Sequence, residues 1–353
     1  MSDNPKEAER EMEKAIFISA DCWLEVFDLL PIYQLGHGIA LISHRFDRRV
    51  DEHFKTRKWT LDKLEIRCKI GTNEMEIINS KGKALPIPQN PLPNKVIGFR
   101  SIEIFFIDYN VLTFLHHFHR FLAVISTKWY ITTENVRILE FIVLTIWPMF
   151  KHPIHEMILS PVIFRRMRQF APSILCNCPC LQTVSLFSDI LLEFPPDDSA
   201  NASDGQAVTK WVFSPHPNNL PKMLRVENSE AVNQWLATVE QIKAAFSSAS
   251  SPDAFIIFVH FSPWYSLSAV VPFELTNELT GEQLALSKDE SNAFKLIRCP
   301  IAADGAKEWI NEMKKKVVGR KNKIGFFIGE SGVDKCLLDA ASAGPSGGQK
   351  QQK

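Results

Sequence analysis

Residues 18–46, ISADCWLEVFDLLPIYQLGHGIALISHRF, carry an apolar pattern that is typical of two short helices. Between Asp21 and Leu30, apolar side chains occupy the i, i+3, i+4 and i+7 positions of one helical face, namely Trp23, Val26, Phe27 and Leu30. Ser19 can cap the start of this helix, and Pro31 ends it because proline has no N–H for the helical ladder. The pattern predicts a helix over residues 21–30.

A second apolar stripe follows the proline. Leu35, Ile39, Ile42 and Phe46 share one face at helical spacing, which predicts a second helix over residues 35–46. A segment of roughly 40 residues is too small to enclose a sufficient core by itself. Either the rest of the chain covers the leftover apolar surface, as in an ordinary helical hairpin, or another protein does.

The same stretch resembles the F-box motif, whose usual form is Leu-Pro-x-Glu, an apolar pair, x-Glu-Ile-Leu, Leu-Pro, a further Leu and Val-Ser-Arg-x-Trp. Ser19 stands where that motif has its first proline, and one residue is inserted before Arg45. The matching segments are Ile18-Ser19, Asp21, Cys22-Trp23, Glu25-Val26-Phe27, Leu30-Pro31, Leu35 and Ile42-Ser43-His44-Arg45-Phe46. Further phrases, such as IALISHRFDRRVDEHFKTRKW and PFELTNELTGEQLAL, make the chain similar to the F-box proteins expanded in nematodes.

The resemblance implies a three-helix F-box over residues 16–60. It also implies two partners, a Skp-type adaptor and the cullin scaffold of a ubiquitin ligase. The chain itself would not be an enzyme, because ubiquitin transfer belongs to other subunits. The implied adaptor-binding residues are Ile18, Trp23, Val26, Phe27, Leu30, Pro31, Leu35, Ile39, Ile42 and Phe46.

The composition is that of a folded protein and does not favour binding to nucleic acid. The 353 residues include 40 basic and 40 acidic side chains, so no net field favours a polyanion. Residues 1–15 are charged and lack the apolar core of a secretory signal, which predicts a disordered acidic leader. The seven cysteines are then expected to be reduced, in the cytoplasm or, given the basic run at 314–323, also in the nucleus.

Residues 254–273 contain no Asp, Glu, Lys or Arg and are long enough to cross a bilayer. Pro263 and Pro272 interrupt them, which favours two buried strands joined by a turn over a membrane helix. We therefore expect no membrane partner.

The chain after the F-box predicts an α/β (α+β) fold. Strand-like phrases begin at residues 101, 126, 155 and 181, about 27 residues apart, with helix-like runs between them. This spacing favours a degenerate leucine-rich-repeat-like solenoid, and an irregular α/β domain is the alternative. The expected segments are a strand pair with a proline-rich connector (61–94, prolines in 84–93), strand–helix repeats (95–192), an exposed loop (193–205), an α/β C-terminal region (206–330) and a disordered tail (340–353).

The C-terminal region shows further local signals. Residues 207–213, AVTKWVF, predict a strand, and residues 229–247 predict a helix. Strands are expected near 254–260, 269–276, 283–287 and 293–299, with a hairpin turn at Thr280-Gly281-Glu282, a helix over 304–317 and a last strand within KIGFFIG.

A solenoid would present its parallel strands as one extended face, the usual binding surface of such arrays. Outward side chains on that face are predicted to hold a protein target, namely Lys128, Tyr130, Glu156 and Ser185.

The sequence carries only weak signals for metal binding or catalysis. Cys176, Cys178 and Cys180 alternate, which suits reduced core cysteines on one side of an extended segment better than a zinc knuckle. His116 and His119 could share a helical face but have no acidic or cysteine partner nearby. The chain has no GxGxxG, GxxxxGK[ST], HExxH or GxSxG, so we expect no catalytic residue, cofactor or metal.

The sequence therefore predicts the substrate-receptor subunit of an SCF-type cullin–RING ubiquitin ligase, with an unidentified protein target. The alternative is an adaptor-binding or structural protein-interaction module with no role in ubiquitination.

Overall fold

The computed structural model describes residues 18–30, 34–69, 71–72, 74–90, 96–122, 127–152, 154–187, 191–262, 264, 267–288, 293–301 and 322–342. The chain divides into two compact units, Met1–Trp59 and Thr60–Lys353, which we describe separately. The predicted leader, the predicted helix over 304–317 and Pro31 lie outside the described residues.

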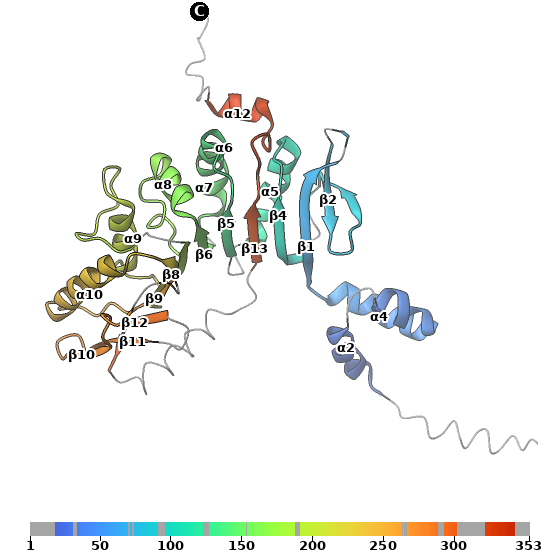
Figure 1. The fold of residues 1–353 in the computed structure, drawn as a ribbon. Coiled ribbons are helices and arrows are strands. Elements are labelled where there is room, and N and C mark those ends of the chain that lie inside the picture. Colours follow the sequence, from blue (N-terminus) through green and yellow to red (C-terminus); the bar gives the residue numbers. More distant parts are fainter. Residues whose placement is uncertain are drawn as a thin grey trace, which may run out of the picture. The chain divides into compact units, whose positions relative to one another are not determined.

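Unit 1 consists of short helical segments (Figure 1). They are α2 (Ala20–Leu29), the single π-turn η1 (Leu35–Ile39), the 3₁₀ turn η2 (Ala40–Ile42) and α4 (His44–Thr56). Ser19 caps α2 as predicted, because its Oγ accepts the Cys22 N–H at 3.2 Å. The predicted first helix is confirmed to within a residue at each end.

The prediction of one helix over 35–46 is wrong. Ser43 has extended backbone angles (φ −165°, ψ 160°), and its Oγ accepts the Phe46 N–H at 3.4 Å. This serine is therefore the N-cap of a new helix, α4, and it interrupts the apolar stripe. As a result Ile42 lies in η2 with 62% of its surface exposed, whereas Phe46 packs inward from α4.

Unit 2 contains a 13-stranded mixed sheet in the order β10-β11-β12-β9-β8-β7-β6-β5-β13-β4-β1-β2-β3. The strands are β1 (Trp59–Cys68), β2 (Met75–Asn79), β3 (Ala84–Pro86), β4 (Val96–Ile104), β5 (Thr127–Ile131), β6 (Ile154–Leu159), β7 (Thr183–Phe187), β8 (Lys222–Ser229), β9 (Phe255–Phe261), β10 (Phe273–Asn277), β11 (Glu282–Lys288), β12 (Ala293–Pro300) and β13 (Asn322–Phe326). The fold is mixed α/β.

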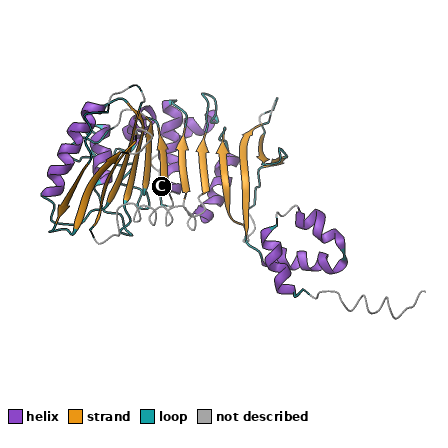
Figure 2. Ribbon diagram, turned by 60° about the horizontal axis from the view of Figure 1, so that its bottom comes forward, coloured by secondary structure: helices purple, strands orange, loops and turns teal. Residues whose placement is uncertain are grey.

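The strands from β4 through β13, β5, β6, β7 and β8 to β9 are parallel. Along the chain, each crossover from β4 to β9 steps in the same direction across the sheet, so right-handed connections place the helices on one face. Figure 2 shows the helices gathered on that side. They are α5 (Tyr109–Leu122), the run of α6 (Val136–Phe141), η3 (Ile142–Ile146) and α7 (Trp147–Phe150), then α8 (Pro161–Phe170), α9 (Asp204–Val212) and α10 (Val232–Ser247).

The larger part of the core of unit 2 lies on this helix-covered face, and a smaller buried cluster of Met223, Ile256, Ile297 and Cys299, on which Phe258 packs, lies on the other side of β8, β9 and β12. One row of register partners crosses the parallel strands, and every member is at most 1% exposed: Ile102, Ile324, Trp129, Met157, Val184, Leu224 and Ile257. Continuous rows of apolar side chains are what a sheet needs to bury one whole face under helices.

The four strands of the predicted repeats were expected to be consecutive neighbours in one sheet, and this expectation is wrong at one place. β5, β6 and β7 are consecutive parallel neighbours, but β13, from the other end of the unit, lies between β4 and β5. A simple solenoid adds each strand beside the previous one. This sheet therefore departs from that pattern where the C-terminal strand enters it.

Antiparallel strands extend the sheet at both ends. Residues 84–86 of the proline-rich segment form the edge strand β3 rather than a free connector, and residues 91–93 lie outside the described part. At the other end, residues 255–261 and 273–277 are strands, and no helix among the described residues could cross a membrane. Gly281 has φ +67° in the β10–β11 turn, where the hairpin was expected.

Two other local expectations are wrong. Residues 204–212 form α9 rather than a strand, because Ser203 and Gln206 make a reciprocal capping box and several of its apolar side chains are buried. Residues 222–229 form β8, for which no strand was expected. The alternation of Leu224 and Val226 is the local signal that indicates this strand. The second wrong expectation is the start of the disordered tail at residue 340, because residues 340–342 belong to α12 (Lys335–Ser342).

The loop at 193–205 is tied to the fold rather than loose. Arg168, 7% exposed, donates to the carbonyl oxygens of Ser199 (3.0 Å) and Ala202 (2.9 Å) and to Asp204 Oδ1 (2.9 Å). Ser203 Oγ donates to Glu193 Oε2 at 2.5 Å. Several charge-assisted bonds converge on one buried guanidinium, which holds the loop in place.

We expect Arg168→Ala to make residues 195–203 the first internal cleavage site, because three of the loop's anchors are lost at once. Limited proteolysis with mass spectrometry of the fragments measures this. Arg165→Ala is the matched control, since the 69% exposed side chain of Arg165 meets Asp204 only from outside. Equal cleavage of the loop in the wild type and both variants would contradict the anchoring role of Arg168.

Candidate protein-interaction surfaces

The core of unit 1 takes up most of the side chains that the motif assigned to the adaptor. Phe27 and Leu35 are fully buried and Val50 is 2% exposed. Trp23 meets Phe46 edge-on at 4.8 Å between ring centroids. Partly buried residues complete the cluster: Trp23, Leu24, Leu30, Ile39, Ala40, Phe46 and Phe54. These side chains hold the helices together and offer little surface to a partner.

Other apolar side chains of unit 1 point into solvent. On α2, Val26 and Leu29 are 41% and 85% exposed, and their i, i+3 spacing makes them neighbours. On η2, Leu41 and Ile42 are 76% and 62% exposed. Exposed apolar residues concentrated in so small a unit mark a protein-interaction site. We call Val26, Leu29, Leu41 and Ile42 the exposed apolar set.

The structure therefore divides the predicted adaptor residues. Val26 and Ile42 belong to the exposed apolar set, and Ile18 is 39% exposed beside α2. The motif missed Leu29 and Leu41. For Leu29 there was a signal, because it lies outside the stripe that packs inward and so has no place in a two-helix core.

Arg57 fixes the end of α2 against the end of α4. Its guanidinium donates to the carbonyl oxygens of Phe27 (3.2 Å) and Asp28 (3.0 Å) in the last turn of α2, where the Phe27 oxygen also accepts the Leu30 N–H at 3.2 Å. His53, 3% exposed, lies 3.1 Å from the same guanidinium through Nε2. Burial and the charge of Arg57 lower the pKa of His53, and Asp28 opposes them.

We expect unit 1 to lose stability as the pH falls below about 6.5, the usual pKa of histidine. The folded-state pKa of His53 is lowered, so the unfolded chain binds more protons in this range and protonation favours unfolding. The stability is fully present above that pH. Urea unfolding of unit 1, followed by amide hydrogen exchange at pH 7.5 and at pH 5.0, measures the loss. His53→Gln should flatten the pH dependence, and an unchanged profile would contradict the assignment.

Unit 2 offers a second surface, the face of the sheet opposite the helices. The row of register partners there is Glu103, Gly325, Tyr130, Ile158, Ser185, Arg225 and Phe258. Apart from Gly325 and Ser185, these side chains are only partly buried. Helices cover the other face of the sheet. The target-binding surface expected from the sequence can therefore lie only on this opposite face.

Of the four predicted target residues, Tyr130, Glu156 and Ser185 lie on the opposite face. Lys128 pairs in register with Glu156, and Tyr130 pairs with Ile158, which pairs with Ser185. Tyr130 and Glu156 are half-buried, whereas Ser185 is only 9% exposed and offers little to a partner. The side chain of Lys128 lies outside the described ones.

Tyr130 is held in an aromatic cluster on this face. Its ring covers Gly325, a position where any side chain would collide with it. Phe327 meets the ring edge-on at 4.8 Å and itself stacks on Phe105 at 5.4 Å, while Lys323 Nζ lies 5.0 Å from the centre of the Tyr130 ring. Burial, with the charge of Glu103, raises the pKa of Tyr130 to about 12. The phenol is therefore neutral at physiological pH and can donate a hydrogen bond.

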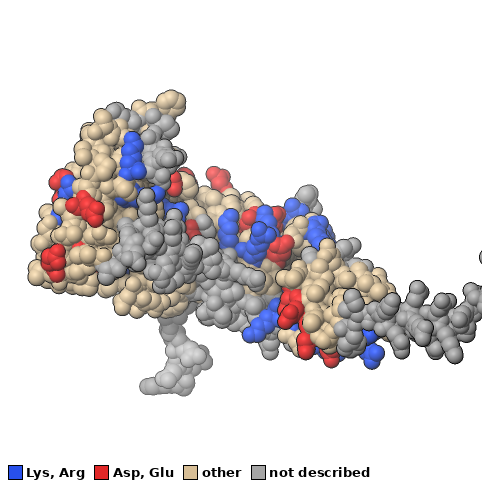
Figure 3. Space-filling model, turned by 90° about the horizontal axis from the view of Figure 1, so that it is seen from below, with Lys and Arg blue, Asp and Glu red and all other residues tan. Residues whose placement is uncertain are grey.

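Charged groups adjoin this cluster and extend across the face. Lys63 Nζ lies 3.0 Å from carboxylate oxygens of both Glu65 and Glu103. Further along the row, the Arg225 guanidinium lies 5.4 Å from the centre of the Phe258 ring, and its buried Nε has no hydrogen-bond partner. In the view of Figure 3, basic and acidic side chains are intermingled. Aromatic rings mixed with single charges suit a protein surface better than a phosphate backbone.

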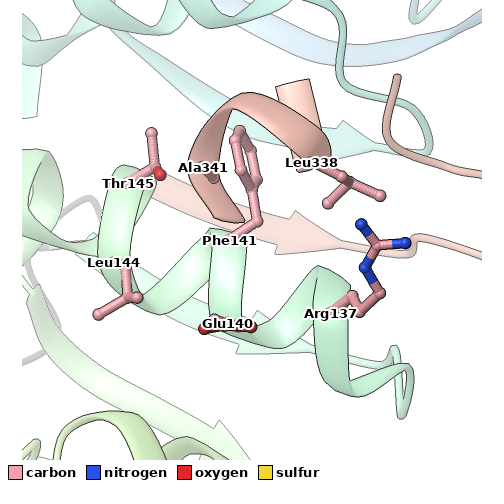
Figure 4. Close-up of a pocket in the computed structure, with 7 residues that line it drawn as sticks. All are labelled: Arg137, Glu140, Phe141, Leu144, Thr145, Leu338 and Ala341. Carbon is pink, nitrogen blue, oxygen red and sulfur yellow. The ribbon is translucent and has the colours of Figure 1, made fainter. Parts of the chain in front are cut away.

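A small cavity of about 100 Å³ lies between α6–η3 and α12 (Figure 4). Its lining includes Phe141, Leu144 and Leu338, and Arg137 at its rim pairs with Asp339 at 3.0 Å. Sites for metabolites and cofactors usually measure some hundreds of Å³. This cavity is therefore better explained as a gap in the packing between α6–η3 and α12 than as a ligand site.

The cysteine and histidine motifs do not converge on a site. Residues 172–177 form turns, so the expectation of an extended CNCPC segment is wrong. Cys178 is 4% exposed, and burial raises the pKa of its thiol above the usual range. His116 is exposed on α5, and the side chain of His119 is outside the described ones. Within the described residues, no group of three or more His, Cys, Asp or Glu could hold a metal ion.

A buried lysine was not expected from the sequence. Lys222, 6% exposed, donates through Nζ to the Trp211 carbonyl oxygen and to Ser214 Oγ, each at 2.6 Å. Burial lowers its pKa to about 8. Trp211 is in the last turn of α9, where its carbonyl oxygen also accepts the Ser214 N–H at 3.2 Å, so the ammonium adds a charged donor at the negative end of the helix. Its role is thus to cap a helix.

Comparison with known proteins adds no name to these surfaces: no family model, curated protein or solved structure matches this chain.

Proposed function

We propose that the chain is the substrate-receptor subunit of an SCF-type cullin–RING ubiquitin ligase, acting in the cytoplasm or nucleus. Unit 1 would bind a Skp-type adaptor, and unit 2 would hold a protein target. The observation that carries this proposal is the exposed apolar set on unit 1, within a segment that resembles an F-box.

Three features support a docking role for unit 1. Its core of Phe27, Leu35 and Val50 is its own, so its helices do not need the sheet to hold together. Arg57 and His53 lock α2 to α4. A surface fixed in this way loses little entropy on binding, which favours affinity. Four apolar side chains remain exposed on the first helix and the turn that follows, namely the exposed apolar set.

Unit 2 supports the target-binding half of the proposal. The opposite face offers partly buried aromatic rings and charged groups on adjacent rigid strands, the composition that protein interfaces favour. The chain would act by tethering: a target held near the ubiquitin-loading enzyme meets it at high effective concentration.

The test uses purified full-length chain and a purified Skp-type adaptor in a pull-down and in calorimetry. Leu29→Asp with Leu41→Asp should reduce affinity at least tenfold, about 1.4 kcal/mol, because two charges would enter an apolar interface. Leu144→Asp, on a 54% exposed apolar residue of unit 2, is the matched control and should bind normally. Wild-type chain that does not bind any Skp-type adaptor would overturn the proposal.

A second arm separates the ligase from a module that binds the adaptor for another purpose. Proteins captured by unit 2 in cells should accumulate when the proteasome is inhibited, and should not do so with the Leu29→Asp, Leu41→Asp chain. Capture without accumulation favours an interaction module with no role in ubiquitination.

A further inference from the structure

Strand β10 forms one edge of the sheet in unit 2. Its inner side pairs with β11, where the Asn277 carbonyl oxygen accepts the Gly281 N–H at 2.9 Å. Backbone groups alternate in direction along an antiparallel strand, so those of Leu275 also face β11. The N–H and C=O groups of Glu274 and Thr276 therefore face outward, and both residues are exposed.

Apart from the exposed charge of Glu274 and Pro272 just before the strand, this edge lacks the features that usually protect an edge strand. Such strands are commonly very short, or carry proline, lysine or a bulge that blocks pairing with another chain. The other edge of the sheet follows that rule, because β3 has three residues and ends in Pro86. β10 has five residues, FELTN, with neither proline nor lysine among them and in regular register with β11.

Both ends of β10 are fixed in place. Asn277, 7% exposed, donates through Nδ2 to the carbonyl oxygens of Phe246 (2.7 Å) and Ala249 (3.0 Å) at the end of α10. At the other end, Lys243 Nζ of α10 lies 4.2 Å from the centre of the Phe273 ring. The edge, which no described strand pairs with, is thus held extended before any partner arrives, which lowers the entropy cost of pairing.

The surroundings of β10 indicate the chemistry of its partner. Val271 and Leu279, just outside the two ends of the strand, are 69% and 82% exposed. Glu274 within the strand and Glu278 just after it are exposed carboxylates. A second copy of this strand in full antiparallel overlap would place Thr276 opposite Glu274, so the carboxylate would face no cation. A basic strand would find opposite charges and apolar contacts at both ends.

We propose that β10 is a docking site for an extended segment of a partner protein, which carries lysine or arginine at alternate positions and adds to the sheet as a further strand. Main-chain hydrogen bonds supply the binding energy and side chains the selectivity, as in other cases of strand addition. This site is separate from the exposed apolar set of unit 1 and does not depend on adaptor binding.

Fluorescence anisotropy on the full chain, without adaptor, tests the proposal with labelled peptides of about eight residues, the length of a typical strand. The basic probe alternates lysine and valine, the acidic probe alternates glutamate and valine, and a third probe has proline in the middle of the basic one. We expect only the basic probe to bind well. Equal binding of all three probes, or no binding of the basic probe, would overturn the proposal.

Two variants locate the site. Thr276→Pro removes an outward N–H and should weaken the basic probe at least tenfold, whereas Thr276→Val keeps that N–H and should bind as wild type. Glu274→Lys with Glu278→Lys should reverse the preference toward the acidic probe, which keeps the test valid even if the proline variant misfolds. An unchanged preference, or a wild-type dimer in sedimentation that Thr276→Pro disperses, would show that the site or its occupant is wrong.

Discussion

Removal of residues 322–353 should prevent unit 2 from folding, although these residues come last in the chain. They include β13, whose Ile324 and Phe326 are 1% and 0% exposed between β4 and β5. Phe326 also packs on Trp129 at 4.7 Å between ring centroids. Replacing one buried Phe by Ala costs about 3–5 kcal/mol, and a whole domain has only about 5–15 kcal/mol of stability. Loss of the strand therefore exceeds what unit 2 can tolerate.

Circular dichroism and thermal unfolding measure this loss. A chain that ends at residue 342 is the control, because it keeps β13 and α12 and should unfold like the full chain. A cooperative transition at the wild-type temperature in the chain that ends at 321 would show that β4 and β5 can pair without β13.

A point substitution tests the same junction more finely. Gly325→Val should destabilise unit 2 by about 1–3 kcal/mol, because the new side chain meets the Tyr130 ring that covers this glycine. Adding Tyr130→Ala should recover part of the loss, with a coupling of at least roughly 0.5 kcal/mol in a double-mutant cycle. Additive effects in urea unfolding would mean that the ring and the glycine do not constrain each other.

Leu35→Ala should unfold unit 1 while unit 2 stays folded. Leu35 is fully buried beside Phe27, and truncation of a buried leucine costs about 2–5 kcal/mol. A unit of this size has little stability to spare. Hydrogen exchange should therefore speed up in peptides from residues 18–58 and stay unchanged in peptides from β5 to β9.

Leu29→Ala is the matched control, since the same residue type is 85% exposed there and surface changes usually stay within about 0.5 kcal/mol. The comparison also bears on adaptor binding. Loss of binding in Leu35→Ala would report unfolding, whereas loss in the Leu29 and Leu41 variants would report contact. Equal protection of unit 1 in Leu35→Ala and wild type would contradict the core described here.

Much of the local structure could be predicted from the sequence. The helix over 20–29 follows from its apolar spacing, Ser19 and Pro31, all within a few residues of one another. The strands expected from residues 126 and 155, the helices between 109 and 170 and the turn at Gly281 were likewise found by periodicity and turn chemistry, whereas the strand expected from residue 101 begins at Val96. Where a competing local signal was misread, as at the Ser203 capping box of α9, the prediction was wrong.

The sites were less predictable than the elements. An apolar residue on a short helix can face its own core or a partner, and spacing alone does not separate the two cases. Hence Leu35 was assigned to the adaptor but is buried, while the exposed Leu41 was missed. On the sheet, strand alternation placed Tyr130 and Glu156 on the right face, but it could not show that Ser185 is almost covered.

By itself the sequence determined the helix over 20–29, the F-box-like pattern and the alternation of strands and helices, because each depends on residues close together in the chain. Only the tertiary structure decided that β13 enters the sheet between β4 and β5, and that β10 is the edge strand among the described residues. Strand order depends on pairing between segments far apart in the chain, as for the register partners Ile102 and Ile324 in β4 and β13. Such pairing is selected by the burial of whole rows of side chains across the sheet, and no local pattern encodes it.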